Sequence, residues 1–195
     1  MKTSKPLFII ILGRPGSGKG TQADLLEKKF NLQHVSTGQI LRRRAKKKDY
    51  VGKKLFEILE SGNLVPTPLV FQLWMPILEA FYKKSTKKGI LFDGSPRKLY
   101  EARMLDETLR FYSWKKSQIT VLNIQISPKE AMKRLLKRGR HDDERADIQN
   151  RLGWYIEEVI PVLLHYKRQG LKFDVNGAQS VEDVHKEILR KLKLG

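Results

Sequence analysis

A glycine-rich stretch near the amino terminus carries the clearest chemical signal in the sequence. Residues 13–22 read Gly-Arg-Pro-Gly-Ser-Gly-Lys-Gly-Thr-Gln and directly follow an apolar run. Glycines let backbone N–H groups turn inward around phosphate oxygens, and a helix beginning after such a loop adds the positive end of its dipole. Lys19 is spaced to reach terminal phosphates, and Thr21, one place later than usual, is the candidate hydroxyl for a magnesium shell. The plainer interpretation is a tight strand-to-helix turn, but the GxxxxGK spacing favours a site for a nucleoside triphosphate.

Three later segments make the signal more specific. They are His-Val-Ser-Thr-Gly-Gln-Ile-Leu-Arg at 34–42, Asp-Gly-Ser-Pro-Arg at 93–97 and Arg-Leu-Leu-Lys-Arg-Gly-Arg-His-Asp-Asp at 134–143. Together with the glycine-rich loop, and in this order, they resemble the adenylate kinases and their nucleoside monophosphate kinase relatives over essentially the whole chain. The resemblance implies reversible transfer of a phosphoryl group from MgATP to AMP, which yields two ADP.

The resemblance also gives the arginines their expected tasks. It implies that Arg42 and Arg97 grip the acceptor phosphate, that Arg138 is a donor-side arginine of a lid, and that Arg140 and Arg151 span the transferring group. Two polyanions must be brought together in this reaction, and planar guanidinium groups suit that task. Each arginine alone could be an ordinary surface residue, so the expectation depends on their joint agreement with the motifs.

Asp93 is the candidate acidic group of the site. It ends an apolar run and precedes Gly94. A carboxylate at such a strand end can order magnesium-bound water or pair with Lys19, and a simple turn aspartate is the alternative. With the arginines, this completes the predicted catalytic set: Lys19, Asp93, Arg97, Arg138, Arg140 and Arg151.

The same resemblance distributes further residues between two nucleotide sites. The predicted ATP site consists of Gly16, Ser17, Gly18, Lys19, Gly20, Thr21, Arg134, Arg138 and Gln179. The predicted AMP site consists of Thr37, Arg42, Asn63, Leu64, Val65, Gly94, Ser95, Pro96, Arg97, Glu101, Arg140 and Arg151.

Glu101 is the departure from the family pattern that bears on the acceptor base, because adenylate kinases typically carry Gln there. A Gln amide can both donate to and accept from adenine, whereas an ionised carboxylate only accepts and matches two adjacent donors of guanine. Thr37 matches the position that usually carries Thr in adenylate kinases and Ala in uridylate/cytidylate kinases, a resemblance that favours a purine. A Thr that opens a helix is also a plain N-cap. AMP is the first choice, and a GMP-specific or broader kinase is the alternative. Gln39, Ser95 and Pro68 are further departures.

Apolar runs alternate with helical patterns along the chain. Strands are expected at 7–12, 90–93, 119–126 and 171–175, with helices from Pro128 to a stop at Gly139 and over 181–194. This alternation predicts an α/β fold with a parallel sheet covered on both faces and ligands at the carboxyl ends of the strands. The resemblance implies the three-layer P-loop nucleoside triphosphate hydrolase-like core with an acceptor-binding flap and a short lid.

The expected division is a core of residues 1–35, 66–137 and 149–195, a flap of 36–65 and a short lid of 138–148. Because the lid is short and the chain has no Cys, no structural zinc is expected, and magnesium is expected only with ATP.

The composition leaves one question open. The 195 residues include 39 Lys and Arg against 21 Asp and Glu, a net charge of +18, while a 40% hydrophobic content excludes a disordered basic tail. The apolar run at 7–12 is too short to span a bilayer, so we expect a soluble, cytoplasmic monomer with no membrane partner and no specific nucleic acid partner. Removing the six assigned cations leaves 33 basic residues against 21 acidic ones. A basic nucleic-acid-associated P-loop protein is therefore the alternative class, and salt-dependent retention on DNA or RNA would distinguish it.

Overall fold

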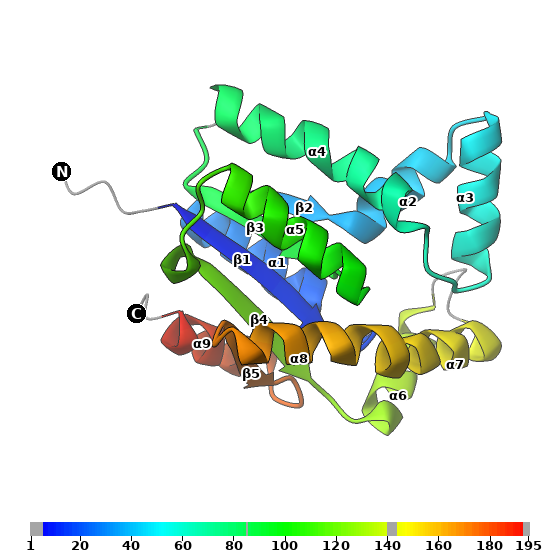
Figure 1. Ribbon diagram of the computed structural model, residues 1–195. Coiled ribbons are helices and arrows are strands. Elements are labelled where there is room, and N and C mark those ends of the chain that lie inside the picture. Colours follow the sequence, from blue (N-terminus) through cyan, green and yellow to red (C-terminus); the bar gives the residue numbers. More distant parts are fainter. Residues whose placement is uncertain (1–5, 85, 140–143, 193–195) are drawn as a thin grey trace.

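A five-stranded sheet forms the centre of the computed structural model (Figure 1), which describes residues 6–84, 86–139 and 144–192. The strands lie in the order β2-β3-β1-β4-β5, and every pairing between these neighbours is parallel. All of them therefore end at the same edge, here named the carboxyl edge, and begin at the opposite one, the amino edge. The strands are β1 Leu7–Gly13, β2 Gln33–Ser36, β3 Gly89–Asp93, β4 Ile119–Gln125 and β5 Lys172–Asn176.

Strand β1 lies in the middle of the sheet because its apolar run is covered on both faces. Phe8 and Ile10 belong to the core on one face, whereas Ile9 and Ile11 belong to the core on the other. All four side chains are fully buried. Successive side chains of a strand point to opposite faces, so a continuous apolar run suits a strand buried between two layers.

Helices cover both faces of the sheet and complete three layers. In Figure 1, α4, α5 and α8 lie on the near face, and α1 and α9 lie behind the strands. This arrangement confirms the α/β prediction. The covering helices are α1 Lys19–Phe30, α4 Thr67–Lys84, α5 Leu99–Phe111, α8 Ile160–Arg168 and α9 Val181–Lys191, and a short 3-10 turn, Lys116–Gln118, precedes β4.

The ends of α6, Pro128–Arg138, follow from local chemistry. The side chain of Ser127 accepts a hydrogen bond from the backbone N–H of Glu130 over 3.1 Å, which caps the first turn. Gly139 ends the helix in the left-handed region with φ of 61°, a conformation that favours glycine. The predicted helix from Pro128 to Gly139 is confirmed.

Two helical excursions leave the core at the carboxyl edge. Helices α2 Thr37–Ala45 and α3 Tyr50–Glu60 connect β2 to α4, and α7 Arg145–Trp154 follows α6 (Figure 1). A π-helical turn, Tyr155–Val159, joins α7 to α8. Residues 140–143 of the predicted lid lie outside the described residues.

Candidate active site

The carboxyl edge of the sheet opens into a cavity of about 410 Å³. Its walls come from segments far apart in the sequence, namely the glycine-rich loop, the start of α2, the end of β3, and helices α6 and α7. In parallel α/β sheets ligands bind at this edge, so the location agrees with the sequence-based expectation. The predicted residues that line this cavity are Gly16, Gly18, Lys19, Gly20, Thr21, Arg42, Asp93, Gly94, Arg97, Arg134, Arg138 and Arg151.

The glycine-rich loop is held tightly against the sheet. A Cβ at Gly13, where φ is 146°, would lie 2.3 Å from the carbonyl oxygen of Ile124 on β4, so this position requires glycine. Gly18 adopts φ of 88° immediately before α1 begins at Lys19. The loop therefore leads directly into a helix N-terminus whose free N–H groups face the cavity, the arrangement that binds phosphate.

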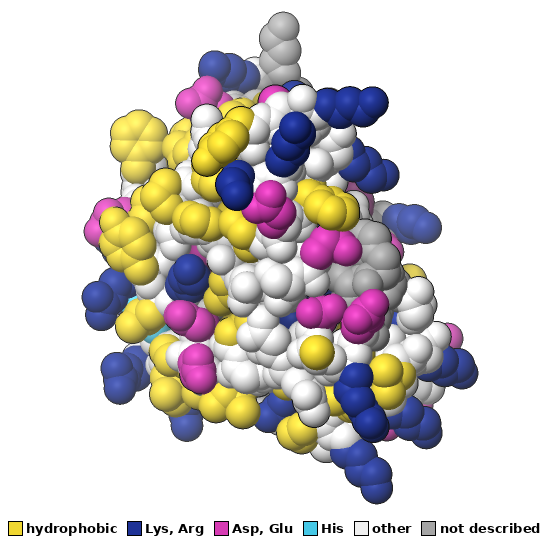
Figure 2. Space-filling view, turned by 90° about the vertical axis from the view of Figure 1, so that its right-hand side faces the viewer, with side chains coloured by type: hydrophobic (Ala, Val, Ile, Leu, Met, Phe, Trp, Pro, Cys, Tyr) yellow, Lys and Arg dark blue, Asp and Glu magenta, His cyan; other side chains and the backbone are white. Residues whose placement is uncertain are grey.

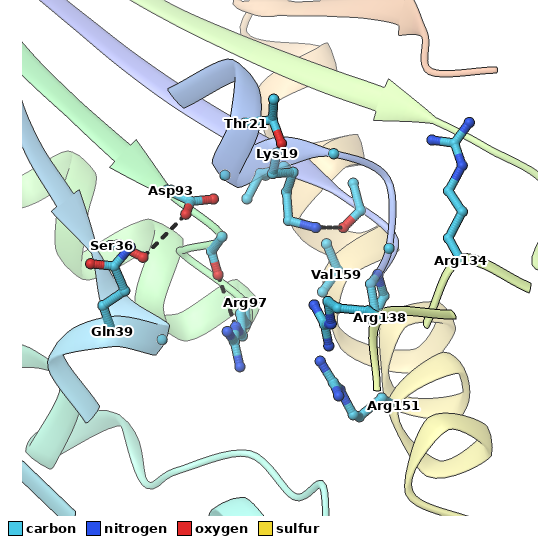
Figure 3. A pocket seen from close by; sticks show the side chains of 18 of the residues that line it. Lys19, Thr21, Ser36, Gln39, Asp93, Arg97, Arg134, Arg138, Arg151 and Val159 are labelled. Carbon is cyan, nitrogen blue, oxygen red and sulfur yellow. Dashed lines mark hydrogen bonds between the residues drawn. The ribbon is translucent and has the colours of Figure 1, made fainter. Parts of the chain in front are cut away.

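Lys19 is curled onto the loop. Its ammonium donates to the carbonyl oxygens of Gly13 and Arg14 over 2.9 and 2.8 Å. One of these two bonds is drawn in Figure 3. Burial lowers the pKa of Lys19 to about 8, because Asp93 only partly offsets the desolvation. A buried cation held by neutral carbonyl groups gains from the approach of an anion, so the arrangement suits a ligand with phosphate groups.

Asp93 lies at the end of β3, beside the end of the loop, where a Cβ on Gly20 would lie 3.8 Å from its Oδ2. In the sheet it is in register with Ser36, whose hydroxyl donates to Asp93 Oδ2 over 3.1 Å (Figure 3), and His34 Nε2 lies 3.8 Å from the same oxygen. Burial opposes ionisation, but His34 and the charge of Lys19 outweigh it and hold the pKa of Asp93 below its usual value. The carboxylate is therefore charged at neutral pH and can bind a cation or its water shell.

His34 links this carboxylate to helix α1. Its Nδ1 lies 3.0 Å from Glu27 Oε2, and its side chain is 9% exposed. Burial would lower the pKa of His34, but the neighbouring carboxylates of Asp93 and Glu27 raise it above the usual value. The His34 imidazole therefore stabilises the ionised form of the Asp93 carboxylate.

Guanidinium groups from three elements converge on the cavity opposite Lys19 (Figure 3): Arg97 after β3, Arg138 at the end of α6 and Arg151 on α7. Arg97 is fixed by a hydrogen bond from its Nε to the carbonyl oxygen of Gly94 over 2.8 Å and lies over the ring of Trp154, 5.4 Å from its centroid. Arg134 points away from this group and pairs with Glu130 over 2.6 Å (Figure 3). Such a concentration of cations suits a polyanionic ligand.

A second, much smaller cavity adjoins the first through Arg97. Glu101 lies here, 3% exposed, and accepts a hydrogen bond from the backbone N–H of Arg97 over 2.7 Å. Burial raises the pKa of Glu101 although that hydrogen bond and the charge of Arg97 oppose the shift. The predicted residues that line this cavity are Thr37, Leu64, Val65, Ser95, Arg97 and Glu101.

Thr37 has a partner that the sequence did not indicate. The indole of Trp74 on α4 donates to the Thr37 hydroxyl over 2.9 Å, in a fully buried contact. The contact fixes the Thr37 side chain at the wall of the small cavity, while Ser36 occupies the N-cap position of α2. The hydroxyl oxygen accepts this bond and keeps its own hydrogen for another partner.

Comparison of the sequence with known proteins identifies the family of this chain. The family model described as adenylate kinase matches residues 11–171. The adenylate kinase of Azobacteroides pseudotrichonymphae genomovar. CFP2 is 39% identical over 190 residues, which cover 95% of this chain and 97% of that protein. The chain belongs to the adenylate kinase family. The resemblance stated from the motifs is therefore confirmed.

Other members of the adenylate kinase family match over similar lengths. The adenylate kinase of Corynebacterium urealyticum is 36% identical over 181 residues, covering 93% of this chain and 96% of its own. Adenylate kinase isoenzyme 1 of Oryctolagus cuniculus is 36% identical over 200 residues, covering 98% of this chain and 96% of its own.

Not every residue predicted from the adenylate kinase pattern lines a cavity. The side chain of Ser17 is buried, with its hydroxyl 3.5 Å from the Lys19 ammonium, and Pro96 is buried beside Ser95. Gln179 lies after β5 and donates to Asn176 and Glu187, and Asn63 accepts from Asn150 on α7 over 3.0 Å. Arg140 lies outside the described residues.

Several residues that line the large cavity had no site role predicted from the sequence, among them Asp24, Ser36, Trp154 and Val159. Ser36 was part of a quoted motif without a role, and its value appears only when β2 is placed beside β3. Trp154 lies one helical turn after Arg151, so the helical spacing from an assigned arginine was the available signal.

Proposed function

We propose that this chain is a nucleoside monophosphate kinase that transfers the terminal phosphoryl group of MgATP to AMP and gives two ADP. One observation carries the proposal: Lys19 and the guanidinium groups of Arg97, Arg138 and Arg151 surround one cavity beside a glycine-rich loop. Phosphoryl transfer depends mainly on positioning two phosphate groups and neutralising their charge, and this cavity contains the groups for both tasks. The names of the chain's relatives agree with this function.

The donor nucleotide occupies the loop side of the cavity. Backbone N–H groups of residues 16–21 surround its phosphates, and Lys19 turns from its carbonyl partners toward them. Thr21 and Asp93 supply oxygen ligands or water acceptors for the magnesium ion of MgATP, which neutralises charge on the phosphates. Arg138 approaches from α6, Arg134 turns from Glu130 toward the donor, and Gln179 contributes from the loop after β5.

The acceptor nucleotide occupies the side between α2 and α5. Arg42 and Arg97 bind its phosphate, and Arg151, with Arg140, spans the group in transfer. The attacking atom is a phosphate oxygen whose second pKa is about 6, so it is mostly ionised at neutral pH and needs no general base. The protein therefore orients the two reactants and excludes water.

The acceptor base enters the small cavity beside the phosphate site. Thr37, Leu64, Val65 and Ser95 line it, and Glu101 faces the base. AMP is our first choice. GMP remains the second candidate because Glu101, buried in this cavity, offers the acceptors that match guanine.

Closure of two mobile parts completes the proposed cycle. The flap of residues 36–65 closes over the acceptor and the short lid of 138–148 over the donor, on the core of 1–35, 66–137 and 149–195. Such closure removes water that would otherwise hydrolyse ATP, as is general for adenylate kinases. We expect the enzyme to act as a cytoplasmic monomer.

The deciding experiment measures ADP formed from ATP with AMP, GMP, CMP, UMP and dAMP as separate acceptors. We expect the highest kcat/KM with AMP. The Lys19→Ala variant should lose at least about a hundredfold in kcat/KM, since it lacks a preorganised charge at the reacting phosphates. Lys28→Ala, in an exposed lysine at the other end of α1, is the matched control and should retain activity. Normal transfer by Lys19→Ala would refute the assignment of the loop.

A further inference from the structure

The amino edge of the sheet concentrates positive charge that phosphoryl transfer does not use. The chain enters β2, β3, β4 and β5 through residues 28–32, 86–88, 110–118 and 167–171, which contain nine Lys and Arg and no Asp or Glu. Because the strands are parallel, these segments all lie at one edge, opposite the candidate active site. This edge is on the left in Figure 1, where β1 and β3 begin.

These cations point into solvent. Every one of them is exposed except Lys87. Those in the last turn of a helix, such as Lys28 on α1 and Arg110 on α5, complement the helix dipole. Lys88, Lys115 and Lys116 lie outside the α-helices, so the dipole does not account for them.

An exposed aromatic side chain lies within the same edge. Phe111, at the end of α5 and next to Arg110, is 80% exposed. Its ring centroid is 5.1 Å from that of Tyr112, which stacks on Tyr82 of α4 at 4.2 Å with an interplanar angle of 6°. The aromatic group is therefore fixed in place, and Phe111 is its exposed member.

The opposite end of the molecule has a different surface. Figure 2 views the carboxyl-edge side, where Asp and Glu side chains lie among Lys and Arg side chains. The four segments at the amino edge have no such mixture. Nine positive charges are thus gathered in four segments away from the proposed nucleotide sites, with Glu27 and Glu107 on the helices just before two of them.

We propose that the amino edge binds the surface of an anionic phospholipid bilayer, with its Lys and Arg side chains at the lipid phosphates and Phe111 inserted among the headgroups. Basic residues near an anionic leaflet each contribute to attraction, and an exposed aromatic ring adds interfacial burial. No helix in the described part of the chain is long and apolar enough to cross a membrane, so the contact is peripheral. The proposal differs from the sequence-based expectation of no membrane partner.

A single-stranded nucleic acid fits this edge less well. Such strands are bound by several aromatic rings on which successive bases stack. Here Tyr82 and Tyr112 occupy one another's faces, and Phe111 alone has most of its ring in solvent. The single protruding ring surrounded by cations matches a lipid interface better than a base-stacking platform.

The test is co-sedimentation of the full chain with vesicles at physiological salt. Vesicles of phosphatidylglycerol and phosphatidylcholine should pellet the protein, and vesicles of phosphatidylcholine alone should not. The triple variant Arg110→Gln, Lys115→Gln, Lys116→Gln should lose about a hundredfold in apparent affinity. Its matched control is Lys46→Gln, Lys47→Gln, Lys48→Gln, which removes the same charge between α2 and α3. This control should change the affinity by less than about threefold.

Phe111→Ser should weaken vesicle binding about tenfold, whereas Phe56→Ser, at a 51% exposed ring on α3, should not. Equal losses from both triple variants would overturn the assignment to this edge. Absent vesicle binding would overturn the proposal, as would retention on poly(U) RNA in its place. The proposed membrane binding does not depend on the kinase activity, so disproof of one proposal leaves the other in place. Thermal melting of each variant identifies any that fail to fold.

Discussion

The indole Nε1 of Trp154 donates a hydrogen bond to the carbonyl oxygen of Gly62 over 2.8 Å, and the same ring lies under the guanidinium of Arg97. Asn150, one turn earlier on α7, adds a hydrogen bond to the carbonyl oxygen of Ser61 over 2.9 Å. Helix α7 is thereby joined both to the turn after α3 and to the arginine proposed to bind the acceptor phosphate. The Trp154 side chain therefore contacts both the turn after α3 and Arg97, which binds the acceptor phosphate in our proposal.

Trp154→Phe keeps an aromatic ring beneath Arg97 but removes the donor to Gly62. We expect KM for AMP to rise about three- to tenfold with a smaller change in kcat, since one hydrogen bond is lost. Steady-state kinetics with AMP varied at saturating ATP measures both. Trp114→Phe, in a tryptophan packed against Phe8 in the core, is the control. An unchanged KM in Trp154→Phe would mean that the contact does not position the acceptor site.

The pKa of about 8 for Lys19 predicts a pH dependence. Below that value the ammonium is charged and attracts the ATP phosphates; above it the free enzyme loses this charge. We expect kcat/KM for ATP to decline above about pH 8, while kcat persists to higher pH because bound phosphates raise the pKa of Lys19. A kcat/KM that stays level up to about pH 9.5 would contradict the role of its charge.

Glu101→Gln should change the choice of acceptor. The amide offers both a donor and an acceptor to adenine, so kcat/KM for AMP is expected to rise about three- to tenfold and that for GMP to fall. Competition between the two acceptors measures the ratio. If neither value moves, Glu101 does not contact the base and serves only to hold the backbone of Arg97.

The same variant should also be more stable at neutral pH. Because burial raises the pKa of Glu101 in the folded state, ionisation of this group weakens the fold. Its contribution is fully present below the unfolded pKa and is lost as pH rises through the folded pKa. We expect Glu101→Gln to exceed the wild type in free energy of unfolding near pH 7, with a smaller difference toward pH 4. Urea denaturation at both pH values tests the trend.

Asp93→Asn removes a carboxylate held ionised between Ser36 and His34. We expect kcat to fall at least about a hundredfold, because a charge that organises the magnesium shell is lost. The apparent magnesium requirement should rise in the same assay. Asp183→Asn, in an exposed carboxylate on α9, should leave both unchanged. Full activity of Asp93→Asn would exclude the proposed role.

Local chemistry made much of the fold predictable. The apolar run of β1, the Ser127 cap and the Gly139 stop are written in adjacent residues, and the structure has them within a residue or so of the expected ends. Strand β2 was not predicted, because Gln33–Ser36 is four residues long and three of them are polar. Its strand conformation depends on pairing with β3, which no local pattern contains.

The candidate site, like the fold, was only partly predictable from the sequence. The phosphate loop was recognisable from spacing alone, and the arginines were assigned from their agreement with family motifs. The contacts that hold these residues are different: Trp74 to Thr37, Ser36 to Asp93 and Trp154 to Gly62 join residues 37, 57 and 92 positions apart. Such pairs arise from the packing of whole elements, so a single sequence does not reveal them.

The π-helical turn at Tyr155–Val159 joins α7 to α8 in one continuous helical rod. It sets how far α7 is rotated about the rod axis relative to α8. Val162 and Tyr166 fix α8 against the sheet, whereas Arg151 and Trp154 on α7 face the cavity. Each residue of an α-helix turns the chain by about 100°. A π-helical turn contains one residue more than an α-helical turn, so deleting one residue within it lets the turn close as an α-helix and changes the orientation of Arg151 and Trp154 little. An inserted residue has no such relief: it would turn Arg151 and Trp154 away from the cavity and disable the enzyme by misorientation rather than by unfolding.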